Sequence, residues 1–127
     1  MDLTRDPNEI ARSAAEELRA LNHLTGEQLA YRQPVRVHDT AMALRDLAAR
    51  LPQALQQMQS GLEQLVATGE VRLYDRSGDT LLERQRDVAE AVKAGVVAAA
   101  QLEGAMSAVA RLTTGMARDE PEEDEEP

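Results

Sequence analysis

Apolar residues recur every three or four positions along most of the chain, which is the spacing of one face of an α-helix. The longest run extends from Val37 to Leu65 at alternating spacings of four and three. Its members are Val37, Ala41, Leu44, Ala48, Leu51, Leu55, Met58, Leu62 and Leu65. This repeat is typical of a coiled-coil seam and predicts a helix over 38–68. Pro52 removes one backbone hydrogen bond within it, and because the heptad phase continues past Pro52 we expect a kinked, continuous helix.

A second run with the same spacing occupies the C-terminal half. Its members are Leu81, Val88, Val92, Gly95, Ala99, Leu102, Met106 and Val109. Gly69 is the expected end of the first long helix, and 70–79 is the expected connecting loop. Ser77 or Asp79 then caps a helix over about 79–117. Two seams of similar length joined by a short loop favour an antiparallel helical hairpin.

A shorter helix is predicted over 7–24, before these two. Asp6 is a suitable N-cap, and Pro7 occupies the first helical position, where its missing N–H costs nothing. One apolar stripe is formed by Ile10, Ala14, Leu18 and Leu21. The predicted fold is therefore all-α: a long, coiled-coil-like antiparallel hairpin with an additional N-terminal helix packed across it, in one domain over 1–118. We expect such chains to assemble into a helical bundle.

The amino-acid composition limits the kinds of core and of reactive site that the chain can form. The chain has two Tyr, no Phe, no Trp and no Cys, so a core must be built from Leu, Val, Met and Ala, and disulfides and thiolate sites are excluded. The N-terminal segment has no apolar signal region, and no run approaches the ~20 apolar residues of a membrane span. A cytoplasmic protein without a membrane partner is the expectation.

The net charge of −9 is unevenly distributed. Residues 119–127 (DEPEEDEEP) hold seven of the 23 acidic residues and no basic residue, which leaves 16 acidic against 14 basic residues over 1–118. Like charges between prolines predict a disordered, solubilising tail. The alternative is a tail that competes with nucleic acid for a basic surface.

Motifs for catalysis or metal binding are not found. His23 and His38 lack partners at metal-binding spacing. The segment from Asp75 begins like an EF-hand loop, but its sixth position is Thr80 and its twelfth is Arg86. We therefore predict no enzyme, no metal site and no cofactor.

Arginine forms the one patterned polar feature. Arg32 and Arg36 flank Pro34, and a second group surrounds the predicted loop. The second group is Arg72, Arg76, Arg84 and Arg86. Either group could contact phosphate or an acidic partner, but no aromatic residues for base stacking lie among them, so nucleic-acid binding is not expected.

Two resemblances bear on the function. A hairpin of this size resembles the WXG100 family of secreted proteins, but no Trp-x-Gly lies in the turn, and neither Tyr31 nor Tyr74 has an acid four residues later, which excludes that family. The segment 37–55 (VHDTAMALRDLAARLPQAL) is similar to small uncharacterised helical proteins encoded in actinobacterial genomes, some near mobile-element genes. That resemblance implies an accessory or regulatory role and transfers no site residues.

The sequence thus predicts a protein that acts by protein–protein interaction or assembly, as a homo-oligomer or with a helical partner. The residues expected to form its interface or its own core are Leu44, Leu51, Leu55, Met58, Leu62, Leu65, Val92, Leu102, Met106 and Val109. Core and interface remain alternatives for these side chains. The second functional hypothesis is a small antitoxin-like or DNA-mimicking regulator that uses the acidic segment 119–127.

Overall fold

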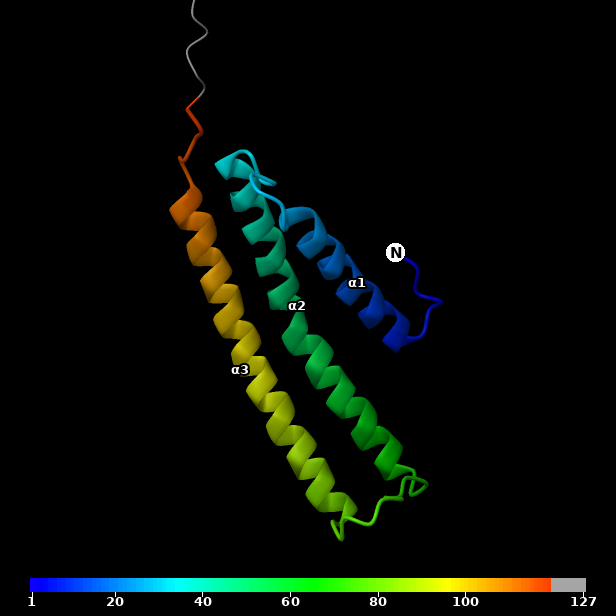
Figure 1. Ribbon diagram of the computed structural model, residues 1–127. Helices are drawn as coiled ribbons and strands as arrows, with labels where there is room; N and C mark the ends of the chain where they lie inside the picture. The colour runs from blue at the N-terminus through cyan, green and yellow to red at the C-terminus, as the bar shows by residue number, and fades with distance from the viewer. Residues whose placement is uncertain (120–127) are drawn as a thin grey trace, which may run out of the picture.

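The computed structural model describes residues 1–119 and contains three helices, α1 (Pro7–Thr25), α2 (Pro34–Ala67) and α3 (Leu81–Thr113). Figure 1 shows α2 and α3 side by side and antiparallel along their whole length, joined at one end by the loop that precedes α3. No strand occurs among the described residues. The predicted all-α fold is confirmed. Apart from Asp119, the acidic segment 119–127 lies outside the described residues.

Helix α2 begins four residues earlier than the sequence predicted. Pro34 takes the first helical position, where its fixed φ suits the helix, and Gln33 before it is extended, with φ −124° and ψ 139°. Residues 34–37, which precede the predicted helix 38–68, therefore supply the first turn of α2. The helix then runs without interruption through Pro52, as predicted.

Helix α3 begins at a capping box that the sequence analysis missed. The Thr80 hydroxyl accepts a hydrogen bond from the Glu83 backbone N–H, and the Glu83 carboxylate accepts one from the Thr80 N–H. The predicted caps, Ser77 and Asp79, lie three residues and one residue before Thr80 and hold the loop instead. At its other end α3 stops at Thr113 rather than Ala117, because Gly115 adopts the left-handed conformation (φ 80°) that ends helices.

The core is a thin layer between α2 and α3. Its fully buried members among the described residues are Ala41 and Ala48 of α2 and Val92, Ala99 and Ala110 of α3. Small side chains allow the two backbones to approach closely. At Gly95 a Cβ atom would lie 3.0 Å from Leu55 Cδ1, so Leu55 packs directly over the glycine.

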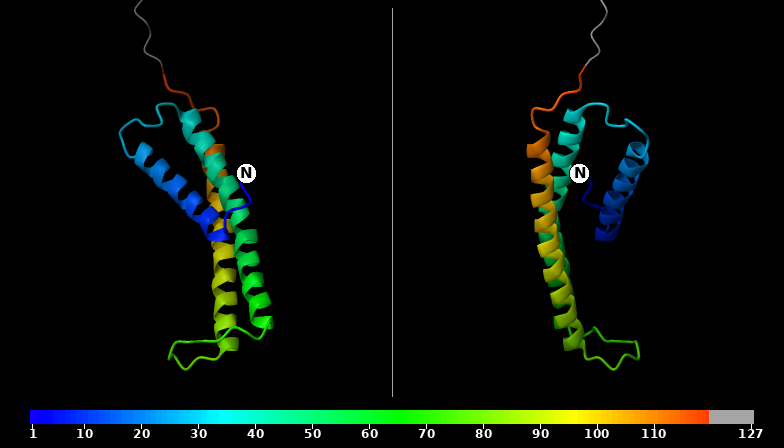
Figure 2. Two further views of the ribbon diagram at one scale, coloured as in Figure 1. Left: turned by 90° about the vertical axis from the view of Figure 1, so that its right-hand side faces the viewer. Right: turned by 60° about the vertical axis from the view of Figure 1, so that its left-hand side comes forward.

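Helix α1 stands apart from this pair. Among the described helices, no Cα atom of α1 lies within 8 Å of α2 or α3, and α1 has no buried residue. Figure 2 shows that the chain folds back through residues 26–33, so that α1 slants past the N-terminal half of α2 on one side of the hairpin. The prediction that α1 packs across the hairpin is therefore wrong for this chain. Its stripe is left only half covered at Leu18 and Leu21.

Candidate interaction surface

The predicted seam of α2 divides into two sets in the structure. Ala41 and Ala48 are buried, and Leu55 and Leu62 at the next two heptads are half-buried. The alternate set drifts outward along the helix. Leu44 is half-buried, whereas Leu51, Met58 and Leu65 are 37%, 61% and 59% exposed.

The residues that lie beside the buried set in the contact with α3 are one position later in the sequence than predicted. They are Arg45, Pro52, Gln59 and Val66, all half-buried. Among the described helices, α3 is the one whose Cα atoms lie within 8 Å of α2, so we assign their cover to α3. The residues of α2 that face α3 therefore keep the predicted alternating spacing of three and four. Every second one of them, however, is one residue later than predicted, which is about 100° further around the helix. This rotation moves the large side chains of the other set onto a flank of α2.

Helix α3 shows the same division. Val92 is buried and Met106 is half-buried, in line with a position facing α2, but Leu102 is 44% exposed. Next to Val109, which is half-buried, Ala110 is the buried residue. Here too, predicted seam residues lie on a flank.

The two flanks lie on the same side of the hairpin. Leu55 packs on Gly95, and His38 contacts Ala110, which fixes α2 and α3 as antiparallel neighbours in one register. In an antiparallel helix pair, two flanks that are rotated by the same angle and in the same sense from the line of contact face the same side of the pair. At about 100° per residue, the flank that carries Leu51 in α2 and the flank that carries Leu102 in α3 have this relation.

We call the combined surface the hairpin face. It consists of Leu44, Leu47, Leu51, Ala54, Met58 and Leu65 of α2 with Ala91, Ala98, Leu102, Ala105 and Val109 of α3. No charged residue lies on these flanks between Thr40 and Leu65 or between Val88 and Val109. The opposite side is different, because it carries charges along its length. Those charged residues include Glu63, Lys93 and Arg111.

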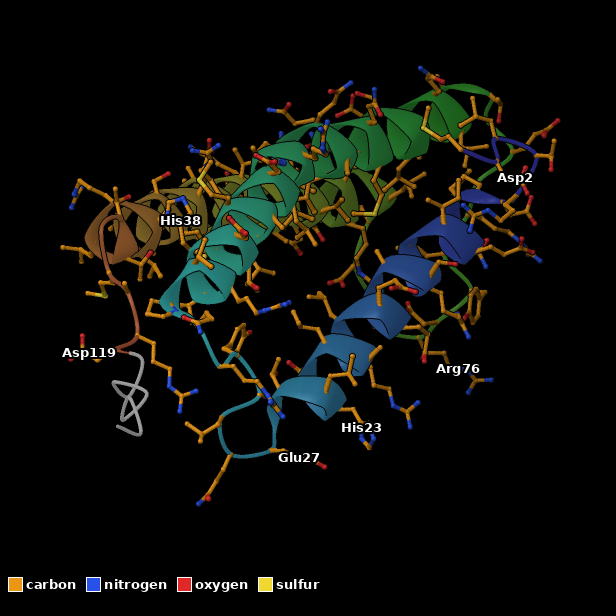
Figure 3. The ribbon with its side chains drawn as sticks, turned by 90° about the horizontal axis from the view of Figure 1, so that it is seen from above. Asp2, His23, Glu27, His38, Arg76 and Asp119 are labelled. Atoms are coloured by element: carbon orange, nitrogen blue, oxygen red, sulfur yellow. The ribbon has the colours of Figure 1, made fainter. Side chains whose placement is uncertain are left out.

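His38 closes the end of the hairpin distant from the loop. Its Nδ1 lies 2.8 Å from the Ala110 carbonyl oxygen and 3.3 Å from the Thr113 hydroxyl. Figure 3 shows His38 beside the C-terminal end of α3, away from His23 on α1. The His38 ring is half-buried and joins the first turns of α2 to the last turn of α3.

Arg84 is held by its own loop. Its guanidinium donates to Asp75 Oδ2 at 2.7 Å, to Asp79 Oδ2 at 2.8 Å and to the Ser77 hydroxyl at 2.8 Å. The Arg84 hydrogen bond is the main reason why the pKa of Asp75 is lowered, and Ser77 adds to it; the two carboxylates in turn raise the pKa of Arg84. This cluster fixes the loop against the first turn of α3, which leaves Arg84 little capacity to bind phosphate.

The other predicted arginines do not gather into one site. Arg72, Arg76 and Arg86 are exposed around the loop. Arg32 and Arg36 lie at the opposite end of the hairpin, and the Arg32 carbonyl accepts a 3.5 Å hydrogen bond from Arg118. The two groups remain separated by the length of α2 (Figure 1).

An apolar groove of ≈ 560 Å³ lies at the Arg32 end, between the α1–α2 linker and the residues that follow α3. Leu29, Tyr31, Val37 and Met116 line it, and it is open to solvent. Leu29 and Arg32 adopt positive φ angles of 57° and 52°, which are uncommon for residues with side chains. The groove results from this bent linker and brings together no set of catalytic groups.

No family model, curated protein or solved structure matches the chain. Within residues 1–119, no group of His, Asp and Glu is placed to hold a metal ion. Over the same residues, no helix has both the length and the apolar character needed to cross a membrane.

Proposed function

We propose that the chain is a non-enzymatic interaction protein that binds another helical surface through the hairpin face. The observation that carries this proposal is a row of large apolar side chains left exposed on the α2 flank, where Leu51, Met58 and Leu65 are 37%, 61% and 59% exposed.

The composition of the core supports the same conclusion. The five fully buried residues of the described chain are four alanines and one valine, and no large side chain there is completely enclosed. The larger Leu and Met side chains lie at the edge of the α2–α3 contact or outside it. Because hydrophobic stabilisation scales with the apolar area removed from water, burial of these Leu and Met side chains against a partner would stabilise the hairpin further.

The test uses a dye that fluoresces on exposed apolar surface, such as anilinonaphthalene sulfonate, over a range of protein concentrations. The dilute chain should bind the dye, and Met58→Glu should reduce this binding, because it places a charge at the centre of the hairpin face. Val97→Glu is the matched control, since Val97 is 53% exposed but points away from α2. A chain that neither binds dye when dilute nor associates when concentrated would have a closed surface, and the proposal would fail.

The regulator hypothesis rests on the acidic run 119–127 and stays a prediction. Deleting that segment separates the two functions. Association through an uncharged face is unaffected by the deletion, whereas an association driven by the acidic run is lost and is also weakened by salt.

A further inference from the structure

The two halves of the hairpin face differ in relief. The α2 flank is a ridge of large side chains, with Leu51, Met58 and Leu65 exposed. The α3 flank at the same level is a trough of small side chains, since Ala91 and Ala98 are exposed alanines. A ridge and a trough on one surface are complementary to each other, but within one chain they lie side by side and cannot pack together.

We propose that the partner of the hairpin face is a second copy of the same chain. A twofold axis parallel to the helices, lying in the interface, places α2 of each copy over α3 of the other. The product is a four-helix bundle in which each helix has antiparallel neighbours, a common and stable arrangement. This inference rests on the proposed function and names its partner.

The register within one chain determines the register between copies. Leu55 packs at the level of Gly95, so Leu51 is level with Ala98, and Met58 is level with Ala91. A twofold axis parallel to the helices keeps these levels. It therefore seats Leu51 on Ala98 of the partner copy and Met58 on Ala91 of the partner copy, a large side chain on a small one in successive layers.

The other symmetric arrangement fits less well. A twofold axis across the helices would place α2 on α2, with Leu51 opposite Met58 of the partner copy and Ala54 near the axis. Ridge would then meet ridge, and the alanines of α3 would face alanines across a gap. Close packing favours the first arrangement, because unfilled space at an interface forfeits dispersion contacts.

The size of the hairpin face suits a stable dimer. From Leu44 to Leu65 it is about 33 Å long, and two packed helices are roughly 20 Å wide. The flat footprint is then about 650 Å² per copy, and the corrugated accessible surface is larger, close to the ~800 Å² per partner of a standard interface. The absence of charge from these flanks means that two like-charged chains meet without opposing ionised groups.

The first experiment measures solution mass by light scattering after size-exclusion chromatography. The wild-type chain should have twice its 13.9 kDa mass. Met58→Glu should raise the dimer dissociation constant by roughly 100-fold or more, because the symmetric interface would bury two unpaired charges. Val97→Glu should remain dimeric. Circular dichroism checks that Met58→Glu is still helical, which is expected because Met58 is 61% exposed in the single chain.

The second experiment tests the arrangement. The chain has no cysteine, so single cysteines can be introduced without background. Leu51→Cys mixed with Ala98→Cys should give a disulfide-linked dimer under mild oxidation, while Leu51→Cys mixed with Ala100→Cys should not. Ala100 is the control because it is an exposed alanine on the opposite flank of α3.

The outcomes separate the inference from the function on which it rests. A monomer that still binds dye through Met58 would overturn the dimer and retain a foreign helical partner. A monomer that binds no dye would overturn both, and it would indicate that α1 covers the face. A dimer that survives Met58→Glu, or one cross-linked by Ala54→Cys alone, would refute the proposed arrangement.

Discussion

His38 and Ala110 are 72 positions apart in sequence, yet the His38 Nδ1 lies 2.8 Å from the Ala110 carbonyl oxygen. The contact joins the beginning of α2 to the end of α3. It is the counterpart of the loop at the other end of the hairpin. Each end of the long helical pair thus has its own polar attachment.

Replacing His38 tests this attachment. His38→Ala should lower the free energy of unfolding by about 1 kcal/mol, the typical net value of a hydrogen bond, since the Ala110 carbonyl loses a partner. Urea unfolding followed by circular dichroism measures the change. His23→Ala is the control, because His23 is exposed on α1 and should have no effect. Equal effects of the two substitutions would contradict the contact.

The Asp75–Arg84 pair should make the loop sensitive to acid. Hydrogen bonds from Arg84 and then Ser77 hold the pKa of Asp75 below its ordinary value of 3.8. A lowered pKa means that the ionised carboxylate favours the folded loop above the ordinary value, and that this contribution is lost as the pH falls through the lowered pKa. Order in the loop, followed by amide exchange between pH 7 and 2, should decline with acid in the wild type.

Asp75→Asn should remove most of this acid dependence, because the side chain then no longer titrates. Asp39→Asn is the control, since Asp39 is exposed on α2 and forms no ion pair among residues 1–119. A wild-type loop with the same protection at every pH would show that the pair does not order it.

Two glycines of α3 offer a matched comparison. Gly104 has nothing within 4 Å of the position of a Cβ atom, so Gly104→Ala should stabilise the helix by about 1 kcal/mol through helix propensity. Gly95→Ala gains the same propensity but brings Cβ to 3.0 Å from Leu55, so its net gain should be smaller or negative. Thermal unfolding of both variants decides this. An equal gain at both sites would mean that Leu55 does not pack on Gly95.

Helix α1 should contribute little to the stability of the hairpin. Leu18→Glu charges the apolar stripe of α1, but no Cα atom of α1 lies within 8 Å of α2 or α3. The hairpin should therefore unfold at the same urea concentration as the wild type, with Leu62→Glu as the destabilising comparison. A large loss of stability from Leu18→Glu would show that α1 is docked in solution.

The sequence was sufficient for the helices but not for the division of their apolar stripes. The predicted seam of α2 and the seam in the structure share Ala41 and Ala48. They differ in whether Leu44 or Arg45, and its equivalents in the later heptads, lies beside them. Hydrophobicity favours leucine, so the pattern predicted a seam of leucines. Two helices alone cover a narrow strip, however, and alanines let them approach closely, so the leucines are left on the flank. A pattern records how wide a stripe is, but not how much of it one neighbour covers.

Local signals were present at the misjudged helix ends. Pro34 is a strong helix start, and Thr80 with Glu83 is a capping box. The cluster around Arg84 could not be predicted in the same way, because it depends on the path of a loop that brings Asp75 back to α3. The position of α1 likewise depends on the unusual backbone at Leu29 and Arg32.

The linker 26–33 also sets a threshold for any partner. It keeps the apolar stripe of α1 within reach of the hairpin, and a segment on a short tether has an effective local concentration in the millimolar range. A molecule that binds the hairpin face from solution must therefore compete with α1, which is attached to the same chain and binds weakly. That competition prevents weak, non-specific apolar binding. A partner whose surface matches the full length of α2 and α3 can still bind.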